Sequence, residues 1–192
     1  MITIVAFDFS DKRDRPVTVE ELAGVKQAGL YCWVDINCSG CLDAQKSCAD
    51  CDQVLRTLGV NEVARSEVLG PDREGRYDVY EDCLHFAVSE AKLNQGRLTT
   101  AHVDVVLGQG YLVTYRRMDA DFVKQMRRTY REDFLKFARS PGFLLYEIGD
   151  YLIEGYRRTL REFQTSVEQV QLQLFGTVDD EKRAAEAGLG TR

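Results

Sequence analysis

Residues 140–156 read SPGFLLYEIGDYLIEGY and open the longest segment of helical periodicity in the chain. After the Ser-Pro-Gly turn, apolar residues recur at steps of three and four as far as Phe175. The members of this stripe are Leu145, Ile148, Leu152, Tyr156, Leu160, Phe163, Val167, Val170 and Leu174. The pattern predicts one helix from Phe143 to Phe175, about 50 Å long and therefore longer than a small domain is wide. We expect its first turns to pack on a sheet and its later turns to project toward a partner or a second helix.

Upstream of this helix, strand patterns alternate with helical ones. Strands are predicted over Ile2–Phe9, Tyr31–Ile36, Asp82–Ser89, Thr99–Leu107 and Tyr111–Tyr115, the last two joined as a hairpin by a Gly-Gln-Gly turn. Helices are predicted over Leu42–Leu58, closed by Gly59, over Asp119–Ala138, and within Pro16–Leu22, where Thr18 and Glu21 have capping-box spacing. Because the strands carry apolar residues on both faces, we expect helices to cover both sides of the sheet.

The composition is that of a globular protein. The 192 residues are 44% hydrophobic and 29% charged, which excludes disordered and low-complexity classes. Lys and Arg number 25 against 31 Asp and Glu, and this net charge of −6 argues against a nucleic-acid-binding domain. No apolar run approaches the about 18–20 residues that cross a bilayer, and Met1–Phe7 lacks the features of a signal peptide. We therefore expect a cytosolic setting with reduced cysteines.

The chain divides into three parts on these patterns. We predict an α/β domain over residues 1–142, the long helix over residues 143–176, and a poorly ordered tail over residues 177–192. The tail is expected because the charged run Asp179–Arg183 and the Ala- and Gly-rich end carry no apolar stripe to bury.

Cys38, Cys41, Cys48 and Cys51 form a CxxC–x6–CxxC array that admits three interpretations. Four thiolates can hold zinc tetrahedrally, although the six intervening residues are fewer than the about 15–20 of common zinc ribbons. If residues 42–58 are helical, Cys48 and Cys51 instead lie with two leucines on one buried stripe, where cysteine packs as a small hydrophobe. A disulfide or redox role is the third interpretation. Of the three, we favour packing.

The other residues with reactive or ligating side chains fit structural roles. Cys32 and Cys83 lie within strand patterns. His85 and His102 lie on alternating strands without metal-ligand spacing, so core or edge roles are favoured over ligation or base catalysis. The basic segment Arg127–Arg131 alternates with acids and predicts a solvated helix face. The sequence suggests no Ser/His/Asp or Cys/His arrangement, and we expect no enzyme.

Four stretches, in chain order, resemble the amino-terminal cytoplasmic domain of the CorA family of divalent-cation (magnesium and cobalt) transporters, with the ZntB zinc transporters as a branch. They are WVDI at residues 33–36, YEDCLHFAV at 80–88, LGQGYLVTY at 107–115 and SPGFLLYEIGDYLIEGY at 140–156. The last is the most specific, and the order fits across residues 1–176. The chain departs from the family pattern at Ser66-Glu67, in place of a Glu-Asp pair, and at residues 72–76, in place of Arg-Pro-Lys. It looks like a divergent member.

The resemblance implies an α/β fold: an α/β/α sandwich with a mixed sheet covered by helices on both sides and a long C-terminal helix. It implies a domain on the cytoplasmic side of the membrane that self-associates as a pentamer in the full-length protein. Family members place their pore in two later transmembrane helices with a Gly-Met-Asn signature, which this sequence lacks. We expect a fragment or truncated homologue that conducts no ions by itself.

The resemblance also implies regulation by magnesium or another divalent cation bound to acidic residues between subunits. Glu90, Asp119 and Asp121 are the candidates for that role. The alternative function is a free-standing zinc-binding adaptor or sensor that uses Cys38, Cys41, Cys48 and Cys51 as ligands.

Overall fold

A mixed β-sheet forms the centre of the computed structural model, which describes residues 1–40, 44–71 and 77–188, with side chains omitted for 44–48 and 175–188. Across these described residues the sheet has seven strands in the order β2-β1-β3-β7-β6-β5-β4. The strands are β1 (Ile2–Asp8), β2 (Arg13–Val17), β3 (Tyr31–Asn37), β4 (Tyr77–Val79), β5 (Cys83–Asn94), β6 (Arg97–Gly108) and β7 (Tyr111–Arg116).

The two central strands explain the apolar runs in the sequence. β3 and β7 pair in parallel, whereas the other neighbouring strands pair antiparallel. β3 is buried on both faces over nearly its whole length, and β7 is buried throughout, as expected for strands with a helical layer on each side. The predicted hairpin is confirmed, since Gly108 at the end of β6 pairs with Tyr111 at the start of β7.

Two helical layers cover the sheet, as the sequence predicts. The helices are α1 (Leu22–Gln27), α2 (Ala44–Leu58), α3 (Glu62–Leu69), α4 (Asp121–Phe137) and α5 (Gly142–Gly188). The cluster on one face joins α1, α2 and α3 to side chains such as Cys32 and Val34, while the cluster on the opposite face joins α4 and α5 to Tyr31 and Trp33. Alternate residues of β3 therefore supply two separate cores.

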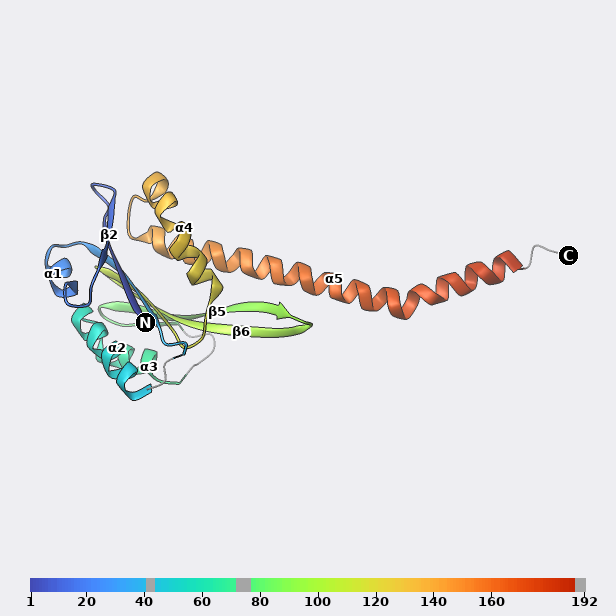
Figure 1. Cartoon of the computed structure of the whole chain (residues 1–192), viewed down its shortest axis with the longest axis horizontal. Coiled ribbons are helices and arrows are strands. Elements are labelled where there is room, and N and C mark those ends of the chain that lie inside the picture. The colour runs from blue at the N-terminus through green and yellow to red at the C-terminus, as the bar shows by residue number, and fades with distance from the viewer. Residues whose placement is uncertain (41–43, 72–76, 189–192) are drawn as a thin grey trace.

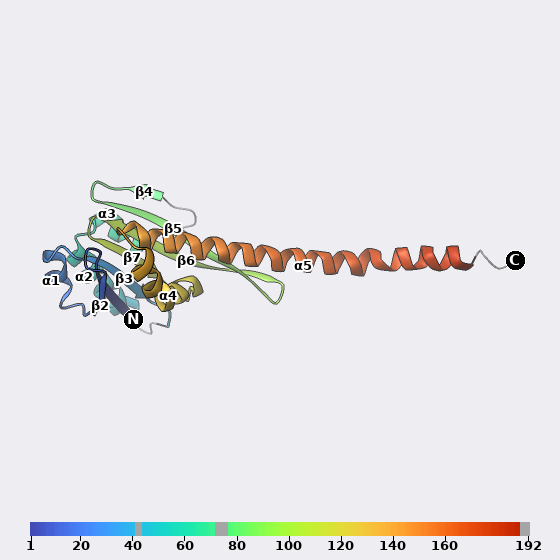
Figure 2. The same ribbon diagram turned by 90° about the horizontal axis from the view of Figure 1, so that it is seen from above.

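The helix α5 is one continuous element that leaves the sheet (Figures 1 and 2). It passes Gly149 and Gly155 without a break, so the predicted single helix is confirmed. It also continues past Gly176 to Gly188, later than expected. The segment after Gly176 is rich in Ala, Glu, Lys and Arg, whose intrinsic helix propensity is high, so it needs no apolar stripe to be helical. The division of the chain at residue 142 stays a prediction.

The buried face of α5 is rotated from the expected one. Leu144 is fully buried, whereas Leu145, which the sequence placed in the stripe, is only half-buried. Ile148 and Leu152 are buried as predicted, and beyond them the apolar side chains from Ile153 onward are largely exposed. Within the ranges described above, no helix combines the length and apolar character needed to cross a membrane.

The helix predicted within Pro16–Leu22 is wrong. Pro16 and Val17 end β2, where they pair with Val5 and Ile4 of β1, and the helix α1 starts only at Leu22. The Glu21 carboxylate does accept a hydrogen bond from the Thr18 backbone N–H (2.9 Å), which is one half of the capping box. Strand pairing therefore overrides the local signal, and β2 tolerates Pro16 because it is an edge strand.

Several elements extend or add to the predicted set. The hairpin of β5 and β6 reaches Asn94 and Arg97, past the expected ends at Ser89 and Thr99. Its two-residue turn has positive φ at both Gln95 (50°) and Gly96 (78°), the type I′ geometry that matches strand twist. The short helix α3 and the strand β4 carried no recognised sequence signal.

Candidate functional site

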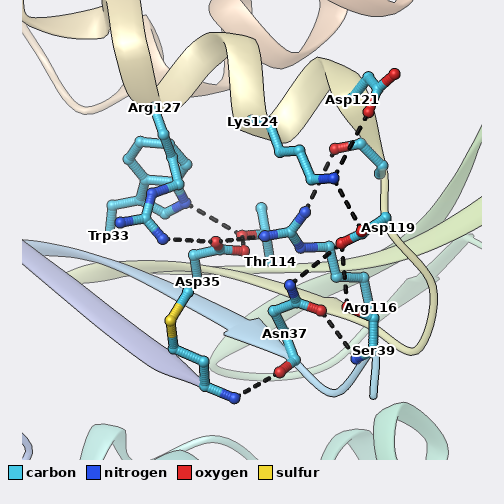
Figure 3. Close-up of polar contacts among 12 residues, drawn as sticks. Trp33, Asp35, Asn37, Ser39, Thr114, Arg116, Asp119, Asp121, Lys124 and Arg127 are labelled. Atoms are coloured by element: carbon cyan, nitrogen blue, oxygen red, sulfur yellow. Dashed lines mark hydrogen bonds and ion pairs between the residues drawn. The ribbon is translucent and has the colours of Figure 1, made fainter.

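Polar side chains gather where the parallel strands β3 and β7 end beneath α4. Asp35 and Asn37 come from β3, and Thr114 and Arg116 come from β7 (Figure 3). Parallel pairing places Asp35 beside Thr114 and Asn37 beside Arg116. The carboxyl ends of parallel strands are where α/β folds commonly place functional groups. This edge of the sheet is therefore a candidate functional site.

The Asp35 carboxylate is the buried centre of this group. Arg116 Nη2 lies 2.9 Å and Arg127 Nη1 lies 3.1 Å from its Oδ2 atom, and the Thr114 hydroxyl donates to Oδ1 (3.0 Å). The Trp33 indole N–H donates in turn to the Thr114 oxygen (3.2 Å). Asp35 and Arg116 are each only 2% exposed. These contacts compensate the buried charge and attach α4 to the sheet through Arg127.

Asp119 lies at the outer end of the group, just before α4. It accepts hydrogen bonds from the Ser39 hydroxyl (3.0 Å) and the Asn37 amide (3.4 Å), and it pairs with Lys124 (2.9 Å). Lys124 and these hydrogen bonds lower the pKa of Asp119. The side chain is ionised at neutral pH and faces solvent.

Glu90 of β5 caps the amino end of α4. Its carboxylate accepts the backbone N–H groups of Asp121 (2.8 Å) and Phe122 (3.0 Å), which have no partner within the first turn of a helix. Lys92 Nζ lies 3.1 Å from Glu90 and also binds Asp121, whose pKa is lowered chiefly by this lysine. A buried carboxylate from a neighbouring strand thus takes the place of a local N-cap.

The three acidic residues predicted from the sequence therefore meet around the start of α4. Lys124 bridges Asp119 (2.9 Å) and Asp121 (3.8 Å), and Lys92 bridges Asp121 and Glu90. Each of the three carboxylates thus lies close to at least one of these two lysine ammonium groups. Among the residues with described side chains, no group of three or more His, Cys, Asp or Glu is arranged to hold a metal ion. Whether a cation binds here stays a prediction.

The structure brings together one cysteine from each half of the array. Cys38 Sγ and Cys51 Sγ lie 3.9 Å apart. Cys51 is buried together with Leu55 and Leu58, which confirms the packing stripe for these residues. Cys41 lies outside the described residues, and Cys48 lies on α2 with its side chain outside the described set.

The remaining predicted structural residues have structural partners. Cys32 and Cys83 are buried in strands. His85 Nε2 lies 2.8 Å from Asp104, and His102 Nδ1 lies 2.7 Å from the Ser89 hydroxyl. Both histidines are thus paired across β5 and β6.

Sequence reasoning missed the Asp35 centre. The signal was present, because Asp35 is a charged residue inside the otherwise apolar strand YCWVDI. Arg127 was expected on a solvated helix face, which is a correction, since its guanidinium binds a carboxylate buried under α4. The pairing joins residues 92 positions apart, and helical periodicity carries no information on such a contact.

Comparison with known proteins shows one matching protein family and several solved structures of similar fold. Residues 32–188 match the model of a family described as CorA-like Mg2+ transporter protein. The soluble domain of CorA from Methanocaldococcus jannaschii is similar in structure, with a TM-score of 0.66 and 15% identity over 92% of this chain and 65% of that one. The full-length CmaX protein is similar at a TM-score of 0.67 and 14% identity, over 89% of this chain and 50% of that one.

The ZntB cytoplasmic domain from Vibrio parahaemolyticus RIMD 2210633 is also similar, with a TM-score of 0.57 and 17% identity over 91% of this chain and 65% of that one. No curated protein matches the sequence. At these identities the solved structures support the fold, and the predicted α/β architecture with a long C-terminal helix is confirmed. The chain spans between half and about two thirds of the solved chains it matches.

Proposed function

The chain belongs to the CorA-like Mg2+ transporter family, and we propose that it forms the cytoplasmic domain of a divalent-cation transporter. The observation that carries the proposal is α5, which packs on the sheet through Leu144, Ile148 and Leu152 and then leaves the domain (Figure 2). A helix that extends this far can join the domain to a further part of the protein. The proposed role is regulatory and requires no catalysis.

Self-association is the first part of this proposal. An apolar groove of about 510 Å³ lies between the tip of the β5–β6 hairpin and α5, lined among others by Leu93, Leu98, Tyr156, Leu160 and Phe163. Exposed apolar patches of this kind mark association sites. The occupant we propose is a second copy of this chain, because the apolar stripe of α5 continues, exposed, beyond the groove to Leu174. A ring of copies would bury the stripe, and the family resemblance favours five.

Cation-dependent gating is the second part. Asp119 and Asp121 are more than half exposed and their pKa values are lowered, so both offer ionised oxygen ligands of the kind that Mg2+ prefers. Lys92 and Lys124 hold these carboxylates in a single copy. A divalent cation shared with a neighbouring copy would compete with these lysines.

The strand β5 couples this acidic group to α5. Glu90 caps α4, while the carbonyls of the residues on either side of it, Ser89 and Ala91, accept hydrogen bonds from Tyr156 and Thr159 of α5. The Thr159 bond measures 2.7 Å. A shift of the amino end of α4 would therefore move the part of β5 that holds α5. This contact is the route by which cation binding would reach the projecting helix.

The test is the solution mass of the chain, measured by size-exclusion chromatography with light scattering, with and without Mg2+ or Co2+. We expect the cations to raise the mass of the wild-type protein. The variant Asp119→Asn with Asp121→Asn should weaken the apparent cation affinity by at least about tenfold, or about 1.4 kcal/mol.

The matched control is Asp11→Asn with Asp50→Asn, which removes the same charge from two aspartates outside the acidic group around the start of α4. It should respond to cations as the wild type does. A mass that ignores cations, or an equal loss in the test and control variants, would overturn the gating proposal.

A further inference from the structure

The connection between α4 and α5 (Figure 1) borders a pocket of about 560 Å³. Three aromatic side chains line it: Phe137 from the last turn of α4, and Phe143 and Tyr146 from the first turns of α5. Phe137 and Tyr146 are both largely exposed, so their rings are accessible to a ligand. A volume of about 300–1,000 Å³ with mainly apolar walls and a few polar groups is typical of small-molecule sites.

The charged group buried at this pocket is the Glu147 carboxylate. Glu147 lines the pocket, yet only 6% of the residue is exposed. It forms no hydrogen bond and no ion pair with any residue that the structure describes. Burying a carboxyl group without a partner costs free energy in either protonation state, and more when the group is charged. The pocket therefore contains a hydrogen-bond acceptor that the chain itself leaves unfilled.

The charges around Glu147 favour a cation as its partner. Burial, together with the nearby carboxylates Asp133 of α4 and Asp150 of α5, raises the pKa of Glu147 to about 7. Arg139 of the connection also lines the pocket, but its side chain is exposed and forms no ion pair with Glu147. A positively charged ligand beside Glu147 would offset both the burial of the carboxylate and the repulsion from the two aspartates.

The lining of the pocket suits an organic cation better than a metal ion. Mg2+ requires several oxygen ligands, and Glu147 is the one carboxylate among the described residues that line the pocket. Aromatic faces attract ammonium groups through cation–π interactions, and they also cover hydrocarbon. An ammonium N–H can in addition donate the charge-assisted hydrogen bond that Glu147 lacks.

We propose that this pocket binds a small primary alkylammonium ion, with the ammonium group on Glu147 and the hydrocarbon part against Phe137, Phe143 and Tyr146. The ligand would touch the end of α4 and the start of α5 together. Because it binds only the folded arrangement, it would stabilise the junction from which α5 leaves the sheet. This site is separate from the acidic group at the start of α4, to which the regulatory cation is assigned.

The experiment is a titration of the whole chain with n-butylammonium chloride, followed by NMR. We expect binding that is at least about tenfold tighter than that of n-butanol, which has a similar shape but no charge. Tetramethylammonium, which has the charge but no N–H donor, should also bind more weakly. The affinity for n-butylammonium should rise about tenfold from pH 6 to pH 8, since the ionised fraction of a carboxyl group with a pKa of about 7 rises in that proportion.

Variants then assign the contacts, and the melting temperature of each shows that it is folded. Glu147→Gln should lose at least about tenfold in affinity together with the pH dependence. Tyr146→Ala changes an exposed ring and should weaken binding about two- to fivefold. Arg139→Gln removes a competing cation and should bind at least as tightly as the wild type. Glu162→Gln, the same change on the exposed part of α5, is the matched control and should bind as the wild type does.

Three results would overturn the proposal. Equal affinities for n-butylammonium and n-butanol would show a merely apolar pocket, and unchanged binding by Glu147→Gln would show that the carboxylate is not the ligand. A lower solution mass of Glu147→Gln would identify a basic side chain of a second copy as the occupant. The titrations contain no Mg2+ or Co2+, so they are independent of the test of the proposed transporter function.

Discussion

Asp35 keeps its charge inside the protein because three donor side chains from two other elements converge on its carboxylate. Thr114 and Arg116 reach it from β7, and Arg127 reaches it from α4. A buried charge without such partners would cost several kcal/mol, whereas this one connects the sheet to the helical layer. The Asp35 group therefore holds α4 against the sheet. In doing so it supports the position of the exposed residues Asp119 and Asp121 at the start of α4.

The substitution Asp35→Asn should destabilise the chain by about 3–5 kcal/mol, because it leaves the buried Arg116 guanidinium without its counter-charge. The measurement is the free energy of unfolding from urea denaturation. Asp50→Asn on the exposed side of α2 removes the same charge and should cost less than about 0.5 kcal/mol. A loss below about 1 kcal/mol for Asp35→Asn would show that the ion pair contributes little.

Glu147 is the second residue whose environment has a measurable consequence. It is buried on α5, and burial, with the nearby Asp133 and Asp150 carboxylates, raises its pKa to about 7. In the unfolded chain a glutamate has a pKa of about 4.3. Between this pH and pH 7 the folded protein therefore keeps a proton on Glu147 that the unfolded chain has lost. The contribution of this group to stability is full at low pH and is lost as the pH rises toward and through 7.

Glu147→Gln should therefore remove part of the decline in stability between pH 5 and pH 8. We expect the free energy of unfolding of the variant to exceed that of the wild type by about 1–2 kcal/mol more at pH 8 than at pH 5, since solvent at the edge of the site screens part of the effect. Unfolding free energies at both pH values provide the measurement, and Glu162→Gln on the exposed part of α5 is the control. Parallel pH profiles for wild type and Glu147→Gln would contradict the raised pKa.

At the scale of elements, the apolar residues of α5 keep the same helical spacing in its buried first turns and in its exposed later turns. Its first turns lie against α4, where the rings of Phe143 and Phe134 pack 6.3 Å apart between centroids, and its later turns carry the same apolar spacing into solvent. Periodicity predicts the helix, whereas only the neighbouring elements determine which turns are buried. The difference between Leu144 and Leu145 arises in this way, because the approach of α4 sets the rotation of α5.

Leu144→Ala should destabilise the chain by about 2–5 kcal/mol, since it leaves a cavity at a fully buried position. Ile153→Ala, on the same helix but 60% exposed, should cost less than about 1 kcal/mol. Chemical denaturation of both variants measures the contrast. Equal losses at the two positions would mean that Ile153 is also covered in solution.

At the scale of the whole molecule, the exposed stripe of α5 is the main feature that a single copy leaves unexplained. Leu160 is 58% and Phe163 is 54% exposed, and both line the groove at the hairpin tip. Exposed apolar groups at regular helical spacing gain from burial against a second surface. This is the physical basis for expecting that the chain associates with itself.

Phe163→Glu should weaken self-association at least tenfold while the melting temperature of the domain stays unchanged, because the charge would be buried between copies. Gln164→Glu introduces the same charge at the next, also exposed position and should leave association intact. Light scattering over a concentration series distinguishes the two. If both variants associate like the wild type, the groove is not the contact between copies.

The sequence by itself determined the α/β class, the β6–β7 hairpin and the continuous long helix, because these depend on periodicity and turn residues within one segment. It also determined the spacing of the cysteine array. Tertiary structure alone decided the pairing of Asp35 with Arg116 and Arg127, the capping of α4 by Glu90, and the meeting of Cys38 with Cys51. Each of these contacts joins distant segments, and the order of the strands sets which segments become neighbours.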